Sequence, residues 1–286
     1  MKVNKLILFL FLLIVSQSAV ALTGSDSLLV DAEQSIAQLS ARLSATRYKD
    51  ALQDSLSVQI SDILGKALEV DGSFNYPFDS IKNDISVVSS TDGRLRIFTW
   101  FSVGDAGNYR YYGFLQYSDK SDREVAIFKL NDCSDDMEDV ENQSLSSRRW
   151  FGMMYYAIVE TKISSETIYT LLGWDGCGLY TTKKIVEPLT FNDFGEPRFG
   201  KPMIKIGRRK ISRLVFEYTK RASMMIQYDA SLDVIVMDHL TALGTQDTDN
   251  PMFFAPDMSY DALKFEDGMW LYQPNIQYMR PKTKRR

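Results

Sequence analysis

The sequence predicts a mainly β protein, α+β overall, in which an N-terminal helical hairpin precedes a large antiparallel β-meander. Apolar residues recur at helical spacing over about residues 26–70, and the periodicity changes to two from about residue 85. Short turns rich in Asp and Gly separate the strand-like runs. Strands and helices do not alternate, so we expect neither a Rossmann fold nor a TIM barrel. The meander is expected to form a sandwich, a barrel or a strongly curved sheet.

The N-terminus has the layout of a secretory signal peptide. Lys2 and Lys5 precede an apolar run over residues 6–15, and a small-x-small sequence follows at residues 19–21. A charged start, a short apolar core and small residues at the cleavage point are what the export machinery recognises. We predict that residues 1–21 are removed, that the mature chain is periplasmic or extracellular, and that no transmembrane segment remains.

Residues 22–72 are predicted to form the helical hairpin. Two apolar stripes at helical spacing are separated by a break near Thr46, and Asp71-Gly72 ends the second helix. The stripes consist of Ile36, Leu39 and Leu43, and of Leu52, Leu56, Ile60, Leu64 and Leu68. One apolar face on each helix predicts that the hairpin lies against another layer of the protein.

Residues 73–279 are predicted to form the antiparallel β domain. Asp92-Gly93 joins two strand-like runs and is a strong hairpin signal. In the second run, Leu95 and Ile97 share one face and Phe98 and Trp100 share the other. About a dozen short strands are expected in all, interrupted by an acidic, serine-rich loop over residues 131–149. The basic residues 280–286 are expected to be a solvated, disordered tail.

Residues 173–178, GWDGCG, place an acid, a tryptophan and a thiol among three glycines. They lie between two strand-like runs, and Asp175-Gly176 matches the turn chemistry of Asp92-Gly93. We therefore predict a turn with positive φ at Gly176 and Gly178, with Trp174 packed at the edge of the sheet.

The chain contains two cysteines, Cys133 and Cys177. In an oxidising compartment they can form a disulfide, which would close a long loop and restrict the unfolded chain. Two free thiols are an equal alternative. The absence of a CxxC motif argues against a zinc knuckle or a thioredoxin-type redox centre.

The single histidine, His239, restricts the catalytic options. A His-rich zinc site is excluded, and a Ser-His-Asp or Cys-His arrangement would have to use this residue. On a strand, Asp238 and His239 would point to opposite faces. We interpret His239 as a residue at the end of a strand rather than as a catalytic base.

Carboxylates gather in the loop at residues 131–142 and in a second cluster over residues 244–261, which ends in the first residues of a predicted strand, SYDALKF (259–265). The first lacks the glycine and the spacing of an EF-hand, so a solvated loop is favoured. In the second, the side-chain oxygens at positions 257, 259 and 261 alternate along the chain and can converge on a calcium ion, the one cofactor that the sequence suggests. Asp and Ser also form self-bonded turns without a metal, so this alternative stays open. The candidate calcium ligands are Asp247, Asp249, Asp257, Ser259 and Asp261.

The sequence contains no complete catalytic constellation, so the principal hypothesis is a non-enzymatic binding or envelope-interaction protein. The alternatives are an Asp/Glu-dependent hydrolase acting on glycans, assisted by calcium, and a structural component of a cell-envelope assembly. A formal net charge of −4 argues against nucleic acid as a partner and leaves an envelope protein or a glycan. The residues that would mark a shared ligand cleft are Trp174, Asp175, His239, Asp257 and Asp261.

Five sequence blocks carry a resemblance to a known group of proteins. They are YTLLGWDG, KKIVEPLTF with the FG-x-P that follows it, RLVFEYTKRASMMIQYD, IVMDHL and PDMSYDALKFEDGMW. In order and spacing they resemble uncharacterised secreted proteins of Bacteroidota-type bacteria, over about residues 74–273. The resemblance implies export and a β-rich domain. It implies no activity, and no catalytic residue is carried over.

Overall fold

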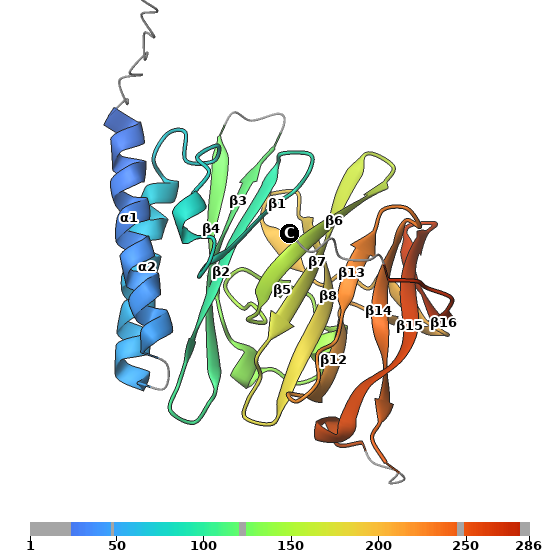
Figure 1. The fold of residues 1–286 in the computed structure, drawn as a ribbon. Coiled ribbons are helices and arrows are strands. Elements are labelled where there is room, and N and C mark those ends of the chain that lie inside the picture. Colours follow the sequence, from blue (N-terminus) through green and yellow to red (C-terminus); the bar gives the residue numbers. More distant parts are fainter. Residues whose placement is uncertain (1–23, 47–48, 120–123, 245–248, 281–286) are drawn as a thin grey trace, which may run out of the picture.

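The computed structural model describes residues 24–46, 49–119, 124–244 and 249–280, and it confirms the predicted fold class. Two helices are followed by antiparallel strands that form three sheets. The helices and the sheets stack as successive layers, with the helices on one outside (Figure 1). The predicted signal peptide, residues 1–21, lies outside the described residues.

The helical hairpin consists of α1 (Gly24–Ala45) and α2 (Asp50–Leu68). Its apolar stripes are buried against one face of the first sheet, where Ile36, Ile60 and Leu64 pack in one cluster with Phe98 and Trp100. Apolar burial of this kind, rather than helix propensity alone, stabilises helices of this length. Within the part of the chain that the structure describes, no helix is both long and apolar enough to cross a membrane.

The first sheet has the strand order β1-β2-β3-β4. Its strands are β1 (Ser86–Ser89), β2 (Leu95–Val103), β3 (Tyr109–Ser118) and β4 (Val125–Asn131). The Asp92-Gly93 turn joins β1 to β2, and Gly93 adopts a φ of 68°. Phe98 and Trp100 face the helices, whereas Leu95 and Ile97 face the next sheet, so the predicted alternation of β2 is confirmed.

The middle sheet has the order β5-β9-β8-β7-β6, and β12 also pairs with β8. Its strands are β5 (Leu145–Ser146), β6 (Met154–Ile163), β7 (Glu166–Asp175), β8 (Thr181–Phe191), β9 (Pro197–Phe199) and β12 (Leu214–Thr219). Leu171 packs toward the first sheet and Leu172 toward the outer sheet. Burial on both faces explains why β7 is an almost continuous apolar run.

The outer sheet has the order β11-β10-β16-β15-β14-β13. Its strands are β10 (Ile204–Ile206), β11 (Arg209–Ile211), β13 (Ile226–Asp229), β14 (Val234–Ala242), β15 (Phe254–Glu266) and β16 (Met269–Ile276). The pair β10–β16 is parallel, whereas the consecutive strands β13 to β16 pair antiparallel. Short 3-10 helices occur at Asp79–Ile81, Ser134–Asp136, Val140–Asn142 and Pro251–Phe253.

Two expectations about the ends of the outer sheet require correction. The sequence predicts residues 254–258 in the loop before the strand expected at residues 259–265, but they belong to β15, since β15 begins at Phe254. Arg280, expected in a disordered tail, is held by the buried carboxylate of Asp238 at 2.7 Å. A buried carboxylate needs a compensating partner, and Arg280 provides one. Residues 281–286 lie outside the described residues.

Candidate functional site

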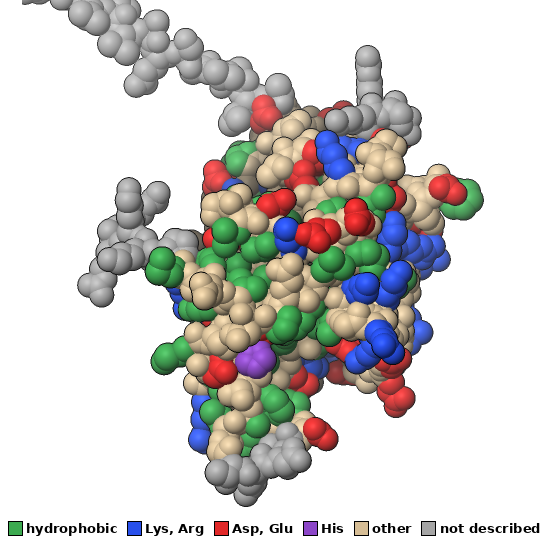
Figure 2. Space-filling view, turned by 90° about the vertical axis from the view of Figure 1, so that its right-hand side faces the viewer, with side chains coloured by type: hydrophobic (Ala, Val, Ile, Leu, Met, Phe, Trp, Pro, Cys, Tyr) green, Lys and Arg blue, Asp and Glu red, His purple; other side chains and the backbone are tan. Residues whose placement is uncertain are grey.

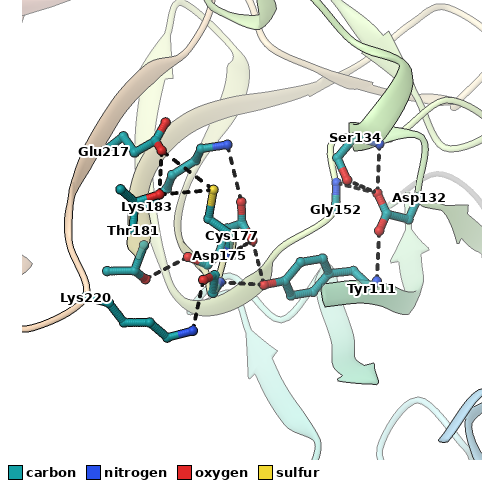
Figure 3. A network of polar contacts seen from close by, with 12 residues as sticks. Tyr111, Asp132, Ser134, Gly152, Asp175, Cys177, Thr181, Lys183, Glu217 and Lys220 are labelled. Carbon is teal, nitrogen blue, oxygen red and sulfur yellow. Dashed lines mark hydrogen bonds and ion pairs between the residues drawn. The ribbon is translucent and has the colours of Figure 1, made fainter. Parts of the chain in front are cut away.

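The loop that follows β7 is fixed to the first sheet by the buried carboxylate of Asp175. Its Oδ1 accepts hydrogen bonds from the Tyr111 hydroxyl and from the N–H of Cys177, each at 2.8 Å (Figure 3). The Tyr111 hydroxyl in turn accepts a hydrogen bond from the N–H of Gly176 at 2.7 Å. Because Tyr111 lies on β3, one buried hydroxyl joins the first and middle sheets at the start of the loop.

Lys183 gives this buried carboxylate a positively charged neighbour. Its Nζ lies 3.7 Å from Oδ2 of Asp175. Burial raises the pKa of Asp175. Burial alone would lower the pKa of Lys183, but the attractions of Asp175, Cys177 and Glu217 together outweigh it, so the pKa of Lys183 is raised. Asp175 therefore holds the loop in place, with its oxygens directed at groups of the protein itself.

The acidic loop contributes a second carboxylate to the same region. Asp132 accepts hydrogen bonds from the backbone N–H groups of Tyr111, Ser134 and Gly152, at 2.8, 3.0 and 3.2 Å (Figure 3). Backbone donors buried away from water need such acceptors. The interpretation of residues 131–142 as a solvated loop is therefore wrong for Asp132.

The glycines of the loop differ from the prediction. The positive φ, 55°, occurs at Cys177 and not at Gly176 or Gly178. Gly176 is needed for another reason: a Cβ atom there would lie 2.3 Å from the ring of Tyr109. Gly178 has nothing within 4 Å of that position. The sequence therefore identifies a special backbone position correctly and assigns it to the wrong residue.

Cys133 and Cys177 are both free thiols, so the disulfide that the sequence allows is not formed. The Sγ of Cys133 lies 3.9 Å from the carbonyl oxygen of Arg148. The Sγ of Cys177 lies 3.7 Å from Oε1 of Glu217. Each thiol thus faces a polar partner of its own. Burial raises the pKa of Cys177, which makes the reactive thiolate scarcer.

Behind the loop, three half-buried aromatic rings pack edge to face or tilted. The Trp174 ring centroid lies 5.7 Å from those of Phe101 and Tyr109. Trp174 therefore packs across the interface between the middle and first sheets. This contact supports the loop, since aromatic pairs of this geometry stabilise beyond the area that they bury.

The tip of the loop displays two large side chains. Leu179 is 60% exposed and Tyr180 is 68% exposed. Leu179 lies against Gly107 of the β2–β3 turn, where a Cβ atom would come 2.4 Å from its Cδ2. We call Leu179 and Tyr180 together the loop patch.

Lys220 holds the other side of the loop. Its Nζ donates to the carbonyl oxygen of Gly178 at 2.6 Å and lies 4.9 Å from the centroid of the Tyr109 ring. Its backbone N–H donates to the carbonyl oxygen of Tyr180 at 2.9 Å. The backbone of the loop patch is therefore fixed from two sides while its side chains remain exposed.

His239 lies in a second, separate cluster on the outer sheet. The β14–β15 register shifts between Asp238 and Leu240, so His239 sits opposite residues 257–259. Its Nδ1 lies 2.8 Å from Oδ2 of Asp261, which also accepts a hydrogen bond from the Tyr272 hydroxyl. The N–H of Asn275 donates to Oδ1 of Asp261 at 2.9 Å. Bulges re-aim side chains in this way.

The five residues that the sequence selects for a common ligand cleft lie in two places. Trp174 and Asp175 belong to the middle sheet and interact with the first sheet. His239, Asp257 and Asp261 belong to the outer sheet, and His239 is visible on the face turned away from the helices (Figure 2). The structure therefore does not bring the five side chains into one cleft.

Three of the candidate calcium ligands, Asp257, Ser259 and Asp261, are engaged with protein groups. The N–H and hydroxyl of Ser259 donate to Oδ1 of Asp257 at 2.9 and 2.6 Å, and Asp261 faces His239. Asp249 is exposed, and Asp247 lies outside the described residues. Among the described side chains, no group of three His, Cys, Asp or Glu residues is arranged to hold a metal ion.

A buried ion pair in the middle of the protein is not among the features predicted from the sequence. Glu187 on β8 and Arg213 before β12 are both 0% exposed, and their side chains form an ion pair. The Tyr155 hydroxyl donates to Oε2 of Glu187 at 2.6 Å, and Trp150 donates to that hydroxyl at 2.8 Å. The one available signal was a lone acid inside the apolar run of β8.

Comparisons of this chain with family models, with curated proteins and with solved structures give no match. The resemblance to uncharacterised secreted proteins of Bacteroidota-type bacteria therefore stays a prediction. What the geometry offers is a rigid loop with exposed apolar side chains, next to carboxylates and a thiol that are occupied by other protein groups.

Proposed function

We propose that this chain is an exported, non-enzymatic binding protein of the bacterial cell envelope, and that the loop patch binds its partner. The observation that carries the proposal is the exposure of Leu179 and Tyr180, 60% and 68%, on a loop whose backbone is fixed. Exposed apolar side chains on a rigid support favour binding, because little conformational entropy is lost when a partner docks.

The state of the carboxylates favours binding over glycan hydrolysis. A glycosidase needs two carboxyl groups that reach the scissile bond from opposite sides. Asp175 and Asp261 are 6% and 1% exposed, and each is bonded to several protein donors. A buried carboxylate with its oxygens occupied cannot approach a sugar, so these two side chains are better explained as structural.

A purely structural role in an envelope assembly would be favoured by a broad apolar face on the helical hairpin. Among the described residues of the two helices, the large apolar side chains that are exposed are Leu28 on α1 and Val58 on α2. Two isolated side chains do not form such a face. The loop patch is the better candidate for a contact surface.

Export is tested by determining the N-terminal residue of the protein secreted by bacterial cells. The charged start, apolar run and small residues at positions 19–21 predict a mature chain that begins at Leu22. Recovery of the chain in the cytoplasm with residues 1–21 intact would contradict the export part of the proposal.

Binding is tested with a double variant of the loop patch, Leu179→Ser with Tyr180→Ser. Co-sedimentation with isolated membranes and with isolated cell-wall glycan is measured for the wild-type chain and the variant. We expect the wild type to sediment with one of the two fractions and the variant to lose most of that binding, about tenfold or more, because both anchors are removed.

The matched control replaces an exposed leucine and tyrosine elsewhere. Leu232 and Tyr228, 51% and 39% exposed, lie on the β13–β14 hairpin of the outer sheet. The variant Leu232→Ser with Tyr228→Ser should bind as the wild type does. Equal loss in both variants would show that binding follows general surface apolarity, and the proposal would be wrong.

A further inference from the structure

The outer edge of β4 is an unpaired sheet edge. Strand β4 pairs with β3 on one side, and on the other side no described strand pairs with residues 125–130. An unpaired edge presents a row of backbone donors and acceptors to any second strand that can approach. This edge lies in the first sheet, in a different part of the protein from the loop patch.

The hydrogen bonds of Asn131 show which backbone groups of β4 point outward. Its N–H donates to Ser147 and its carbonyl accepts from Trp150, at 2.8 and 2.9 Å, so both groups of Asn131 point away from β3. Backbone groups alternate in direction along a strand. Lys129, Ile127 and Val125 therefore also direct their N–H and C=O groups outward, whereas Phe128 and Ala126 direct theirs toward β3.

Both faces of the sheet are hollowed beside this edge. On the helix side, a hollow of about 540 Å³ is bordered by Leu68 at the end of α2, by residues 69–75 that follow it, and by Val125 and Ile127. On the side of the middle sheet, a hollow of about 370 Å³ is bordered by Ala126, Phe128 and Phe194. A strand added beside β4 would place alternate side chains in the two hollows.

The two ends of the β4 edge carry side chains of opposite charge. Glu69, Asp71 and Glu124 border the helix-side hollow near Val125, the start of β4, and all three are exposed. Lys129 is exposed near the end of β4. Among the described residues, neither Lys129 nor these acids take part in an ion pair. One end of the edge is thus acidic, and the other end carries a free cation.

We infer that β4 pairs antiparallel with β4 of a second copy of this chain, which forms a symmetric dimer with one continuous sheet across the two first sheets. With Ile127 opposite its own copy, Val125 lies opposite Lys129 of the second chain. Directly opposite residues share a face of the sheet, so each Lys129 enters the acidic helix-side hollow of the other copy. The two-fold axis makes both ion contacts identical.

Self-pairing is favoured over an unrelated strand because the edge is complementary to itself. The antiparallel direction brings the acidic end of one copy to the cationic end of the other, twice. A parallel arrangement would place like ends together. The paired segment is short, so the dimer is expected to be weak and dependent on concentration.

The test uses two charge variants of the chain without its predicted signal peptide, studied by analytical ultracentrifugation over a wide concentration range. Variant one is Lys129→Glu. Variant two is Glu69→Lys with Asp71→Lys. Each variant alone places like charges at both contacts, so we expect its dimerisation to weaken by roughly thirtyfold relative to the wild type.

The decisive sample is an equal mixture of the two variants. In the mixed dimer, the glutamate at position 129 meets the lysines at 69 and 71, and the native Lys129 of the other copy meets Glu69 and Asp71. Both contacts are attractive again, so the mixture should dimerise as the wild type does. Recovery on mixing also shows that neither variant is misfolded.

The register is checked by cysteine cross-linking in a Cys133→Ser, Cys177→Ser background. Ile127→Cys should form a disulfide across the axis, because opposed Cα atoms in a hydrogen-bonded pair lie about 5.5 Å apart. Ala126→Cys, displaced from the axis, should not. The inference is overturned if the wild type is monomeric at all concentrations, if the mixture does not recover, or if Ala126→Cys cross-links as well as Ile127→Cys.

Discussion

The hydroxyl of Tyr111 lies 2.8 Å from Oδ1 of Asp175, and this hydrogen bond joins the first sheet to the loop that displays Leu179 and Tyr180. The same hydroxyl receives the N–H of Gly176. Because donor and acceptor are buried, neither can exchange its partner for water at low cost. The position of the loop patch therefore depends on a tyrosine that lies 64 residues before Asp175 in the sequence.

Tyr111→Phe should lower the free energy of unfolding by about 1–3 kcal/mol, because it leaves the N–H of Gly176 without its acceptor and removes one donor from the buried carboxylate of Asp175. The measurement is urea unfolding followed by fluorescence. Tyr180→Phe is the control, since the exposed Tyr180 ring is 68% accessible and its hydroxyl can bond to water. Equal effects of the two changes would contradict the role given to Tyr111.

Gly176→Ala should be destabilising by about 1–3 kcal/mol, because its methyl group would overlap the Tyr109 ring. Gly178→Ala should change the stability by less than about 0.5 kcal/mol, since there is open space around it. Thermal unfolding of the two variants compares them directly. The opposite order would mean that Gly178, and not Gly176, is the constrained position.

Arg213→Met should destabilise the protein by about 3–5 kcal/mol, because it leaves the fully buried Glu187 without its cation. Adding Glu187→Leu should recover much of this loss, since two apolar side chains replace the pair. A double-mutant cycle in urea measures the coupling. Strictly additive single effects would contradict the contact.

The burial of Lys184 should make the stability of the folded chain depend on pH. Burial lowers the pKa of Lys184 to about 8, against 10.5 for a free lysine. Below pH 8 the folded chain carries a poorly solvated charge, and between pH 8 and 10.5 the folded state releases this proton before the unfolded state does. The wild-type chain therefore gains stability over that interval.

Lys184→Met removes this charge and should raise the free energy of unfolding at pH 7 by about 1 kcal/mol. The gain is limited because the substitution also removes the favourable contact of the Lys184 ammonium with the Tyr156 ring. The advantage of the variant should disappear as the pH approaches 10.5. Lys210→Met, at an exposed position, should show no such trend. An advantage of Lys184→Met that does not change with pH would refute the assignment.

The layers of the fold follow from local signals in the sequence. Each apolar stripe at helical spacing predicts one helix and the face that it buries. In the same way, the alternation of Leu95 and Ile97 with Phe98 and Trp100 predicts one strand and its two buried faces. Asp92-Gly93 predicts the turn between β1 and β2, in which Gly93 has a φ of 68°. These features can be predicted because each depends only on residues that are close together in the sequence.

The candidate site was only partly predictable, because its partners are distant in the sequence. GWDGCG marks the loop, but nothing near it in the sequence identifies Tyr111 or Lys220 as the groups that hold it. The sequence predicts a loop up to Met258, within β15, where Met258 has a φ of 72° and the pairing is bulged. A bulge interrupts the alternation on which strand prediction depends.

The loop patch is tested most directly by cross-linking in living cells that export the protein, with a photoreactive amino acid in place of Tyr180 or, as control, in place of Tyr228. We expect position 180 to capture one envelope component, protein or glycan, and position 228 to capture none. No capture at position 180, or the same capture at both positions, would contradict the proposal that this loop is the binding surface.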